Sequence, residues 1–281
     1  MPEMENPPPP LLSIITVTYK DPDGLMRTLA SLSRTRTGIT FPWEQVVVDS
    51  SPQENAKTLA EFSGAWSLTH IPQEPRGIYP AMNTGWRAAK GQILWFLNGG
   101  DEAFSGEALV GACGLLETNH SVELVSGGAT LLRNGHVLYD QPPRAGLLPM
   151  LGINRVCQQQ LLYRRSLLER LGGFSEEYRI AADYEFHLRA VHAGARQKTC
   201  NSVLVRFDRG GISSNISRSF EEFARIHRSL REKGQLKYGF MHIFVRSLEL
   251  FRIRFLRILD DLGIGIYLRK IWHSFRRSIR K

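Results

Sequence analysis

Acidic side chains at strand ends and helix starts are the candidates for chemistry in this chain. Asp49 follows a run of three valines and precedes the turn-forming sequence Ser50-Ser51-Pro52. A carboxylate at such a strand end can accept hydrogen bonds from a nucleoside base or a ribose. It can equally cap the turn or helix that follows. The residues alone leave both interpretations of Asp49 open.

The most informative stretch is the apolar run at residues 93–97, which leads directly into Asn98-Gly99-Gly100-Asp101. Glycines let a ligand approach the backbone closely, and here an amide and a carboxylate flank them. Diphosphates and divalent cations suit such a site, because Mg²⁺ takes one or two carboxylates together with phosphate oxygens. The alternative is a glycine turn in which Asp101 caps a helix that begins near Ser105.

Several other functional classes lack their motifs in this sequence. There is no GxGxxG after the first apolar run and no GxxxxGK[ST], which argues against a dinucleotide dehydrogenase and a P-loop enzyme. The three cysteines are far apart and form no CxxC pair. We interpret them as reduced thiols of a cytosolic protein.

These candidate residues require a scaffold, and the apolar pattern indicates which one. Apolar and β-branched runs predict buried strands at residues 12–19, 46–48, 68–71 and 93–97. Helical spacing predicts helices between them, in units of about ten to fifteen residues. This alternation predicts βαβ units and a parallel sheet, whose ligands bind at the carboxyl ends of strands. Asp49 and Asp101 lie at such ends.

The second half of the chain has a different pattern. Asn134-Gly135, between two short apolar runs, predicts a two-residue hairpin turn. Residues 198–207 predict another strand, so the sheet is expected to be mixed here. Residues 179–193 predict a helix that opens near Asp183. The helix macrodipole at that position is expected to lower the basicity of the Asp183 carboxylate.

Six motifs follow one another between Leu12 and Ser213. They are Ser13-Ile14-Ile15-Thr16-Val17-Thr18-Tyr19, Val47-Val48-Asp49-Ser50, Gly77-Ile78-Tyr79 with Ala81-Met82-Asn83, Phe96-Leu97-Asn98-Gly99-Gly100-Asp101, Gly172-Gly173-Phe174 and Ala182-Asp183-Tyr184-Glu185-Phe186. In this order they resemble the inverting family 2 glycosyltransferases of the GT-A fold, especially the colanic-acid type of bacterial exopolysaccharide assembly. The resemblance implies an α/β, Rossmann-like fold: a mostly parallel sheet with helices on both faces, followed by a basic helical segment.

The resemblance also implies roles for the three acids. In such enzymes the early strand-end Asp binds the nucleoside, the DxD region holds metal and diphosphate, and the late Asp is the base. These roles fall on Asp49, Asp101 and Asp183. Asp183 would deprotonate an acceptor hydroxyl as it attacks and inverts the anomeric carbon of a hexose or deoxyhexose. The residues expected to bind the nucleoside diphosphate sugar are Thr18, Tyr19, Asp49, Asn83, Asn98, Asp101 and Gln159.

Two positions depart from the pattern of the family. Asn98 and Gly100 stand where many relatives have two carboxylates, which leaves Asp101 as the main ligand for Mn²⁺ or Mg²⁺. The alternative function is therefore a catalytically silent nucleotide-sugar-binding or scaffold protein at the membrane. A His-Gln pair of the nearest subgroup stands here as Gln158-Gln159, which can hydrogen-bond but cannot titrate near neutrality. These glutamines can also be ordinary exposed strand residues.

Four further side chains are weaker candidates. Tyr19, Tyr79 and Trp95 can stack on a base or a sugar, and Tyr19 is preferred because it ends the first strand. Trp95 fits the core better. Arg189 can pair with a phosphate or with a neighbouring acid.

Positive charge is concentrated at the C-terminal end. Residues 225–281 contain 15 Lys and Arg against four acids, a net charge of +11, so the rest carries −2 of the total +9. A nearly neutral domain joined to a basic tail argues against a nucleic-acid enzyme with a basic cleft. Apolar residues at helical spacing among these arginines predict an interfacial amphipathic helix, or a helix packed on the catalytic domain.

The expected organisation has three parts. Residues 1–10 form a proline-rich leader with no secretory signal, residues 11–220 the GT-A domain, and residues 221–281 the basic tail. The tail is expected to contact an anionic membrane surface and no nucleic acid. The expected location is the cytoplasmic, inner face of the cell membrane. A lipid-linked saccharide in polysaccharide biosynthesis would be accessible there as the acceptor.

Overall fold

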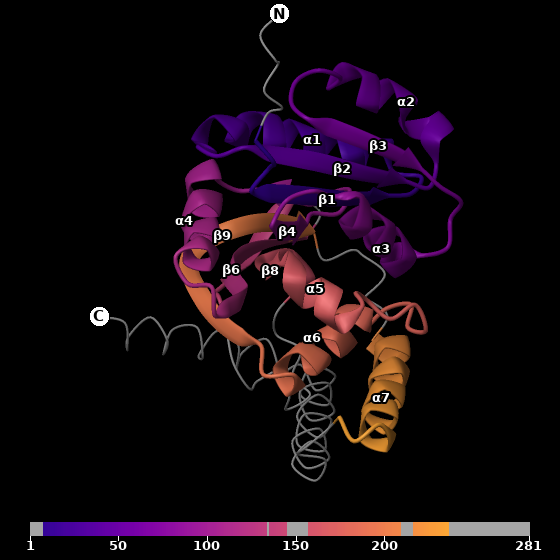
Figure 1. The fold of residues 1–281 in the computed structure, drawn as a ribbon. Helices are drawn as coiled ribbons and strands as arrows, with labels where there is room; N and C mark the ends of the chain where they lie inside the picture. Colours follow the sequence, from indigo (N-terminus) through magenta and orange to yellow (C-terminus); the bar gives the residue numbers. More distant parts are fainter. Residues whose placement is uncertain (1–7, 134, 145–156, 209–215, 236–281) are drawn as a thin grey trace, which may run out of the picture.

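The computed structural model describes residues 8–133, 135–144, 157–208 and 216–235. These residues form a single sheet with helices packed against it (Figure 1). The strands are β1 (Leu12–Thr18), β2 (Trp43–Asp49), β3 (Leu68–Pro72), β4 (Ile93–Phe96), β5 (Glu102–Ala103), β6 (Val122–Arg133), β7 (His136–Gln141), β8 (Leu161–Arg164) and β9 (Arg196–Asp208). The helices are α1 (Pro22–Thr35), α2 (Pro52–Glu61), α3 (Ile78–Ala88), α4 (Gly106–Glu117), α5 (Arg165–Leu171), α6 (Ala182–His192) and α7 (Ile216–Glu232).

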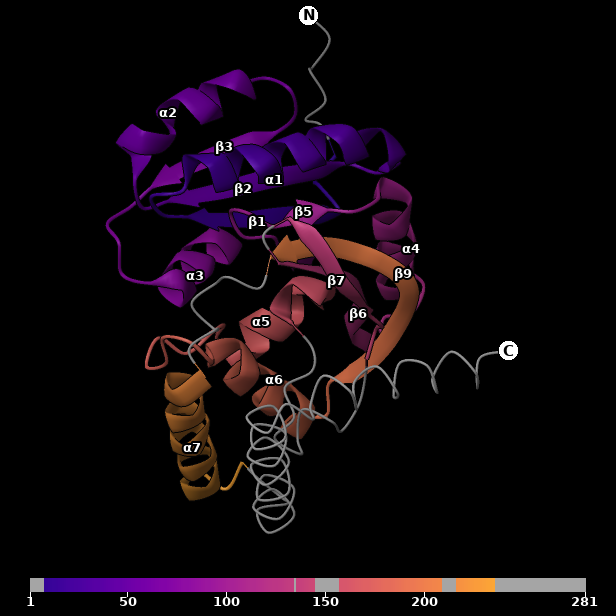
Figure 2. The same cartoon turned by 180° about the vertical axis from the view of Figure 1, so that it is seen from behind.

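The order of the strands confirms the predicted change along the sheet. The sheet runs β3-β2-β1-β4-β8-β6-β9-β5, and β7 pairs with β6. The first four of these strands are parallel to one another, whereas β8 runs antiparallel to β4 and to β6. β6 and β7 form the hairpin predicted around Gly135, and the long, curved β9 lies beside β6 (Figure 2).

Alternate residues of the central strands enter the cores on the two faces of the sheet. On β1, Ile15 and Val17 pack in one core with α3, α5 and α6, while Leu12 and Ile14 pack in the other with α4. Both pairs are fully or nearly fully buried. This burial explains why the strand reads as a continuous apolar run, and it confirms helices on both faces of the sheet.

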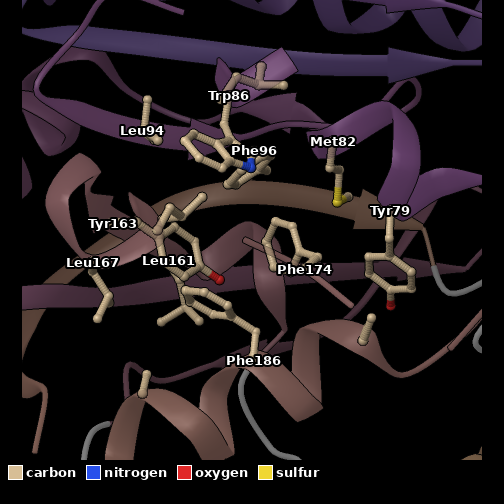
Figure 3. Close-up of a cluster of buried hydrophobic side chains, with 14 of the residues drawn as sticks. Tyr79, Met82, Trp86, Leu94, Phe96, Leu161, Tyr163, Leu167, Phe174 and Phe186 are labelled. Carbon is tan, nitrogen blue, oxygen red and sulfur yellow. The ribbon is translucent and has the colours of Figure 1, made fainter. Parts of the chain in front are cut away.

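Aromatic side chains form the centre of the core that faces α6. The rings of Phe96, Tyr163, Phe174 and Phe186 lie within 5.1–6.4 Å of one another in five pairs, mostly edge to face. Tyr79 joins this cluster through Phe174, at 5.9 Å (Figure 3). Because these rings come from α3, β4, β8, the loop after α5, and α6, the cluster ties the parallel half to the segment that carries Asp183.

The predicted domain boundary at residue 220 is wrong, because α7 is continuous across it. Ile226 and Leu230 of α7 are buried in the same core as α6. The hydroxyl of Tyr184 lies 2.9 Å from Nε2 of His227. The catalytic domain therefore includes α7. Most of the predicted leader and the predicted tail helix beyond residue 235 lie outside the described residues, and no helix among those described is long and apolar enough to cross a membrane.

His187 on α6 makes the stability of the fold dependent on pH. Its side chain is buried, and burial lowers the pKa of His187 from 6.5 to about 4. Below pH 6.5 the His187 side chain is protonated in the unfolded chain but stays neutral in the folded one. Its contribution to the stability of the fold therefore falls as the pH drops toward 4. The loss amounts to about 3 kcal/mol in total. The buried carboxyls Asp101 and Asp183, whose pKa values are raised, titrate in the same range with the opposite effect, so the His187 contribution is measured as a difference between the wild type and a variant.

A pair of histidine variants isolates this contribution. In urea unfolding, the change from pH 7 to pH 4.5 should cost His187→Gln up to about 3 kcal/mol less than the wild type, while the exposed control His120→Gln should show the same change as the wild type. Identical slopes in both variants would show that the fold does not lower the pKa of His187.

Candidate active site

The carboxyl ends of β1, β2 and β4 meet at one edge of the sheet. Thr18 pairs with Asp49 across β1 and β2. On the other side of β1, the amide of Gly99 donates to the carbonyl of Val17 at 3.0 Å. Asp49 and the glycine loop, defined as residues 98–101, therefore flank the end of β1 on opposite sides.

The glycine loop is fastened to α1. The amide of Gly100 donates to the carbonyl of Gly24 and to the hydroxyl of Thr28, both at 3.0 Å. The Thr28 hydroxyl in turn donates to the carbonyl of Asp101 at 2.7 Å. Gly100 has φ +96°, a conformation that residues with a Cβ rarely adopt. These contacts fix the direction in which the Asp101 side chain leaves the loop.

Asp101 is a buried carboxyl with an altered acidity. It is 8% exposed, and its Oδ2 accepts a hydrogen bond from the amide of Asn98 at 3.2 Å. Burial raises the pKa of Asp101 from 3.8 to about 7, although hydrogen bonds from the Gln159 side chain and the Asn98 amide act in the opposite direction. The carboxylate form of Asp101 therefore gains from any cation placed beside it.

The two glutamines lie at this loop and not on an exposed strand. Gln158–Gln160 is a short 3-10 turn before β8, and the indole N–H of Trp95 donates to the carbonyl of Gln159 at 2.8 Å. Gln158 is buried, and the side chain of Gln159 hydrogen-bonds to Asp101. The alternative of ordinary exposed strand residues is therefore wrong. The structure brings Gln159 to the predicted donor site.

Unused polar atoms mark the same edge. In the part of the chain that the structure describes, Thr18 Oγ1, Asn98 Oδ1 and Gln158 Nε2 are buried without a hydrogen-bond partner. A Cβ on Gly99 would lie 3.3 Å from Thr18 Oγ1, so Thr18 and the glycine loop are in close contact. Buried polar groups are normally paired, so these atoms are suited to a polar ligand.

The oxygen atoms of this edge suit a divalent cation only if the ligand supplies others. Asp101 and Asn98 offer one carboxylate and one amide oxygen, both of the hard type that Mg²⁺ and Mn²⁺ accept. No cluster of three or more His, Cys, Asp or Glu side chains able to hold a metal occurs among the described residues. The donor set therefore fits a cation that is shared with a bound diphosphate.

Asp49 is enclosed by protein partners. Its Oδ1 accepts from the amide of Ser51 and from Nδ2 of Asn55, both at 2.8 Å, and its Oδ2 lies 3.2 Å from Nε2 of His70. The side chain is fully buried. Of the two interpretations of Asp49, the structure supports the capping one, and the predicted direct contact with a nucleoside gains no support.

The side-chain amide of Asn83 is also bonded to protein groups, so its predicted role in donor binding gains no support from the structure. Its Nδ2 donates to the carbonyl of Phe174 at 2.8 Å and to Glu176 at 3.0 Å. Its Oδ1 accepts from the indole of Trp86 and from the amide of Phe174. All four hydrogen-bonding positions of the amide are used. A Cβ on Gly173 would lie 2.7 Å from Asn83 Oδ1, which explains the glycine there.

Asp183 lies in the first turn of α6 and is held by a tyrosine. Its Oδ1 accepts from the hydroxyl of Tyr79 at 2.9 Å, and this hydroxyl also contacts the carbonyl of Ile180 at 2.8 Å. Figure 3 shows the Tyr79 hydroxyl directed toward the helix that carries Phe186. Burial raises the pKa of Asp183 and outweighs the hydrogen bonds from Tyr79 and from backbone amides that lower it. The backbone amides at the helix end lower the pKa of Asp183 in the expected direction, but burial outweighs them, so the carboxylate is more basic than usual.

The four weaker candidates for ligand contact differ in their exposure and in their partners. Tyr79 is buried and its hydroxyl is used, so it does not stack on a ligand, whereas Tyr19 is 51% exposed. Trp95 is fully buried, as expected for a core residue. Arg189 pairs with Glu185 at 2.7 Å and donates to the carbonyls of Leu171 and Gly173. Of the two predicted partners of Arg189, a phosphate or a neighbouring acid, the neighbouring acid is therefore confirmed.

Comparison with known proteins decides the family. A family model described as glycosyl transferase family 2 matches residues 13–172. The chain belongs to this family. A protein of Mycobacterium tuberculosis named as an uncharacterized glycosyltransferase is 30% identical over 86% of this chain and 92% of its own length. A glycosyltransferase of PGL/p-HBAD biosynthesis from Mycobacterium bovis is 26% identical over 74% of this chain and 80% of its own length.

Solved structures of related shape confirm the GT-A fold of this family 2 glycosyltransferase. The mannosyltransferase PcManGT from Pyrobaculum calidifontis, in complex with GDP-Man and Mn²⁺, matches 95% of this chain and 80% of its own, with a TM-score of 0.62 and 19% identity. TarS of S. aureus (residues 1–349), in complex with UDP-GlcNAc, matches 78% of this chain with a TM-score of 0.60 and 20% identity. This chain spans 65% of that TarS structure.

Sequence reasoning missed one residue of the glycosyltransferase site. Glu222 of α7 accepts hydrogen bonds from the amides of residues 179–181, directly before the helix that carries Asp183. No local pattern distinguishes Glu222 from the exposed Glu221 beside it. Only the docking of α7 on α6 brings it to the site.

Proposed function

We propose that this family 2 glycosyltransferase transfers a sugar from a nucleoside diphosphate sugar to a hydroxyl acceptor with inversion, and that Asp183 is the base. The observation that carries the proposal is the environment of the Asp183 carboxylate. It is hydrogen-bonded to Tyr79 and, among the described residues, paired with no cation. A carboxylate that a tyrosine orients and burial makes more basic suits the removal of a proton from a hydroxyl.

The reaction is a single displacement. Asp183 accepts the acceptor's proton while the acceptor oxygen bonds to the anomeric carbon, and the bond from that carbon to the diphosphate oxygen breaks. The proton remains on the Asp183 carboxyl, and the nucleoside diphosphate leaves. Tyr79 holds the carboxylate at a fixed orientation by donating to Oδ1. Fixed geometry of this kind lowers the barrier because little reorientation is left for the reacting complex.

The donor would bind at the carboxyl edge of the sheet. Thr18 and Asn98 offer unpaired buried oxygen atoms, Gln159 an amide, and Tyr19 an exposed ring for the base or sugar. Asp101 is the carboxylate that would hold Mn²⁺ or Mg²⁺ together with the diphosphate. Such a cation, when bound, neutralises charge on the departing diphosphate. The bound sugar nucleotides of TarS and PcManGT support this class of donor.

We propose a lipid-linked saccharide as the acceptor and the inner face of a membrane as the location. A lipid-linked saccharide would be consistent with the basic C-terminal tail, if that tail contacts an anionic membrane from the cytoplasmic side. Hexosyl or deoxyhexosyl transfer, and the colanic-acid type of polysaccharide, stay predictions.

A donor panel tests the proposal. The full chain is mixed with UDP-, GDP- and dTDP-sugars, with and without Mn²⁺, and thermal unfolding and release of nucleoside diphosphate are measured. We expect one donor class to stabilise the fold by about 2.7 kcal/mol at a hundred times its Kd. Asp101→Asn should lose the part of this stabilisation that Mn²⁺ adds. Binding without any release, even with acceptor mixtures, would instead support a silent nucleotide-sugar-binding protein, and no stabilisation by any donor would contradict both.

A further inference from the structure

Glu222 of α7 forms a cap for α6 from a different part of the chain. Its Oε1 accepts from the amide of Arg179 at 2.8 Å, and its Oε2 accepts from the amides of Ile180 at 2.8 Å and Ala181 at 2.9 Å. One carboxylate thus binds three consecutive backbone N–H groups. These amides directly precede the turn of α6 that contains Asp183.

The N-cap residue of α6 offers no capping side chain. Ala181 stands at the N-cap position and makes no side-chain hydrogen bond there. The first amides of a helix lack partners within the helix, and a negative charge near them is favourable. Of the three amides that Glu222 binds, that of Ala181 belongs to the helix end and those of Arg179 and Ile180 lie just before it, so the carboxylate brings negative charge to the helix end and holds the approach to α6 from the position of α7.

Packing against α6 holds α7 in the position from which Glu222 reaches these amides. The ring of Phe223, the residue after Glu222, lies 4.8 Å from the ring of Tyr184 on α6. One turn further on, Ile226 is fully buried, and His227 lies 2.9 Å from the Tyr184 hydroxyl. Because Tyr184 follows Asp183 directly, α7 contacts the chain both before the proposed base, through Glu222, and after it, through Phe223 and His227.

We propose that Glu222 is a positioning residue for glycosyl transfer, which holds the segment 179–183 so that the Asp183 carboxylate meets the acceptor hydroxyl. This inference rests on the proposed function, because it gives Asp183 the role of base. Glu222 acts through the backbone and touches neither donor nor acceptor. Its role makes α7 part of the catalytic machinery, although no motif of the family lies on that helix in this sequence.

The charge of Glu222 also acts on Asp183. Among the described residues, the titratable groups that influence this carboxyl are Tyr79 from α3 and Glu222 from α7, while the carboxyl in turn raises the pKa of Tyr163 on β8. Burial is the largest cause that raises the pKa of Asp183, Tyr79 lowers it, and the like charge of Glu222 raises it. Removing the charge of Glu222 should therefore lower the pKa of Asp183.

The test compares Glu222→Gln with Glu221→Gln in the full chain. Glu221 is the exposed neighbour, so this control removes the same charge from the same helix. We expect Glu222→Gln to lose about tenfold to a hundredfold in kcat, because a misplaced base reacts slowly. We also expect the acid limb of its kcat/KM profile to move to lower pH. Glu221→Gln should match the wild type in both measurements.

Two results would overturn the inference. In the first, Glu222→Gln has the same kcat per folded molecule and the same acid limb as Glu221→Gln. A purely structural role of Glu222 would give this result, because it would change only the folded fraction. The other comes from hydrogen exchange of the wild type, which applies even if Glu222→Gln does not fold. The amides of Arg179, Ile180 and Ala181 should exchange as slowly as those within α6, and exchange at the rate of exposed amides would show that no cap exists. A wild type that transfers no sugar contradicts the proposed function instead, while the exchange result still tests the cap.

Discussion

Asp183→Asn is expected to abolish most sugar transfer while leaving the fold intact. Loss of a general base typically costs roughly 10²- to 10⁴-fold in rate, and the loss should appear in kcat. Asparagine has the same shape as aspartate, and its Oδ1 can still accept from the hydroxyl of Tyr79. The donor should bind with unchanged affinity, because Asp183 has no role in holding the nucleotide.

The stability of the same variant distinguishes a catalytic loss from a folding loss. Burial raises the pKa of Asp183, which means that the fold disfavours the charged carboxylate. At neutral pH, Asp183→Asn should therefore melt at the same temperature as the wild type or higher. A catalytically weakened variant that is more stable is typical of an active-site residue. An Asp183→Asn protein that turns over at the wild-type rate would remove Asp183 from the mechanism.

Tyr79→Phe should shift the pH profile in the direction opposite to Glu222→Gln. The hydrogen bond from the Tyr79 hydroxyl stabilises the Asp183 carboxylate and lowers its pKa. Without that hydroxyl the pKa of Asp183 rises, and the acid limb of kcat/KM moves to higher pH. Activity needs the ionised base, so the variant should lose most at low pH. Two substitutions that move the same limb in opposite directions identify the group that titrates.

The strands could be predicted from the sequence because their signals are local. β1 has seven residues, all buried, and an apolar run without Gly or Pro identifies it directly. The position of the glycine loop after β4 follows from the same pattern. The roles of individual polar side chains could not be predicted, because their partners are distant: Asn83 binds Phe174, which is 91 residues away.

The domain boundary shows a different limit of sequence reasoning. The rise in positive charge after residue 224 suggested that a separate tail begins near that point. α7 carries exposed arginines, yet its Ile226 and Leu230 are buried against the catalytic core. Composition reports the solvent-facing side of such a helix, whereas the domain to which it belongs is decided by its few buried residues.

Asn83→Ala is expected to cause the largest loss of stability among the site variants. The substitution leaves the amide of Phe174 and the indole N–H of Trp86 without their acceptor, and both are buried. Each unsatisfied buried group costs about 1–3 kcal/mol, so we expect a loss of about 3 kcal/mol or more in the free energy of unfolding. The neighbouring variant Thr84→Ala removes only a hydroxyl that bonds back to Pro80, and should cost less than about 1 kcal/mol.

Donor binding then separates the structural role of Asn83 from the ligand role that its motif suggested. If its amide serves only to join α3 to the turn at Gly173, the folded fraction of Asn83→Ala should bind donor with the wild-type Kd. Calorimetric titration below the melting temperature measures this. A weakened Kd with unchanged stability would restore the direct contact. The expected result would mean that the motif containing Asn83 acts indirectly, because it anchors the chain that leads through Phe174 to Asp183.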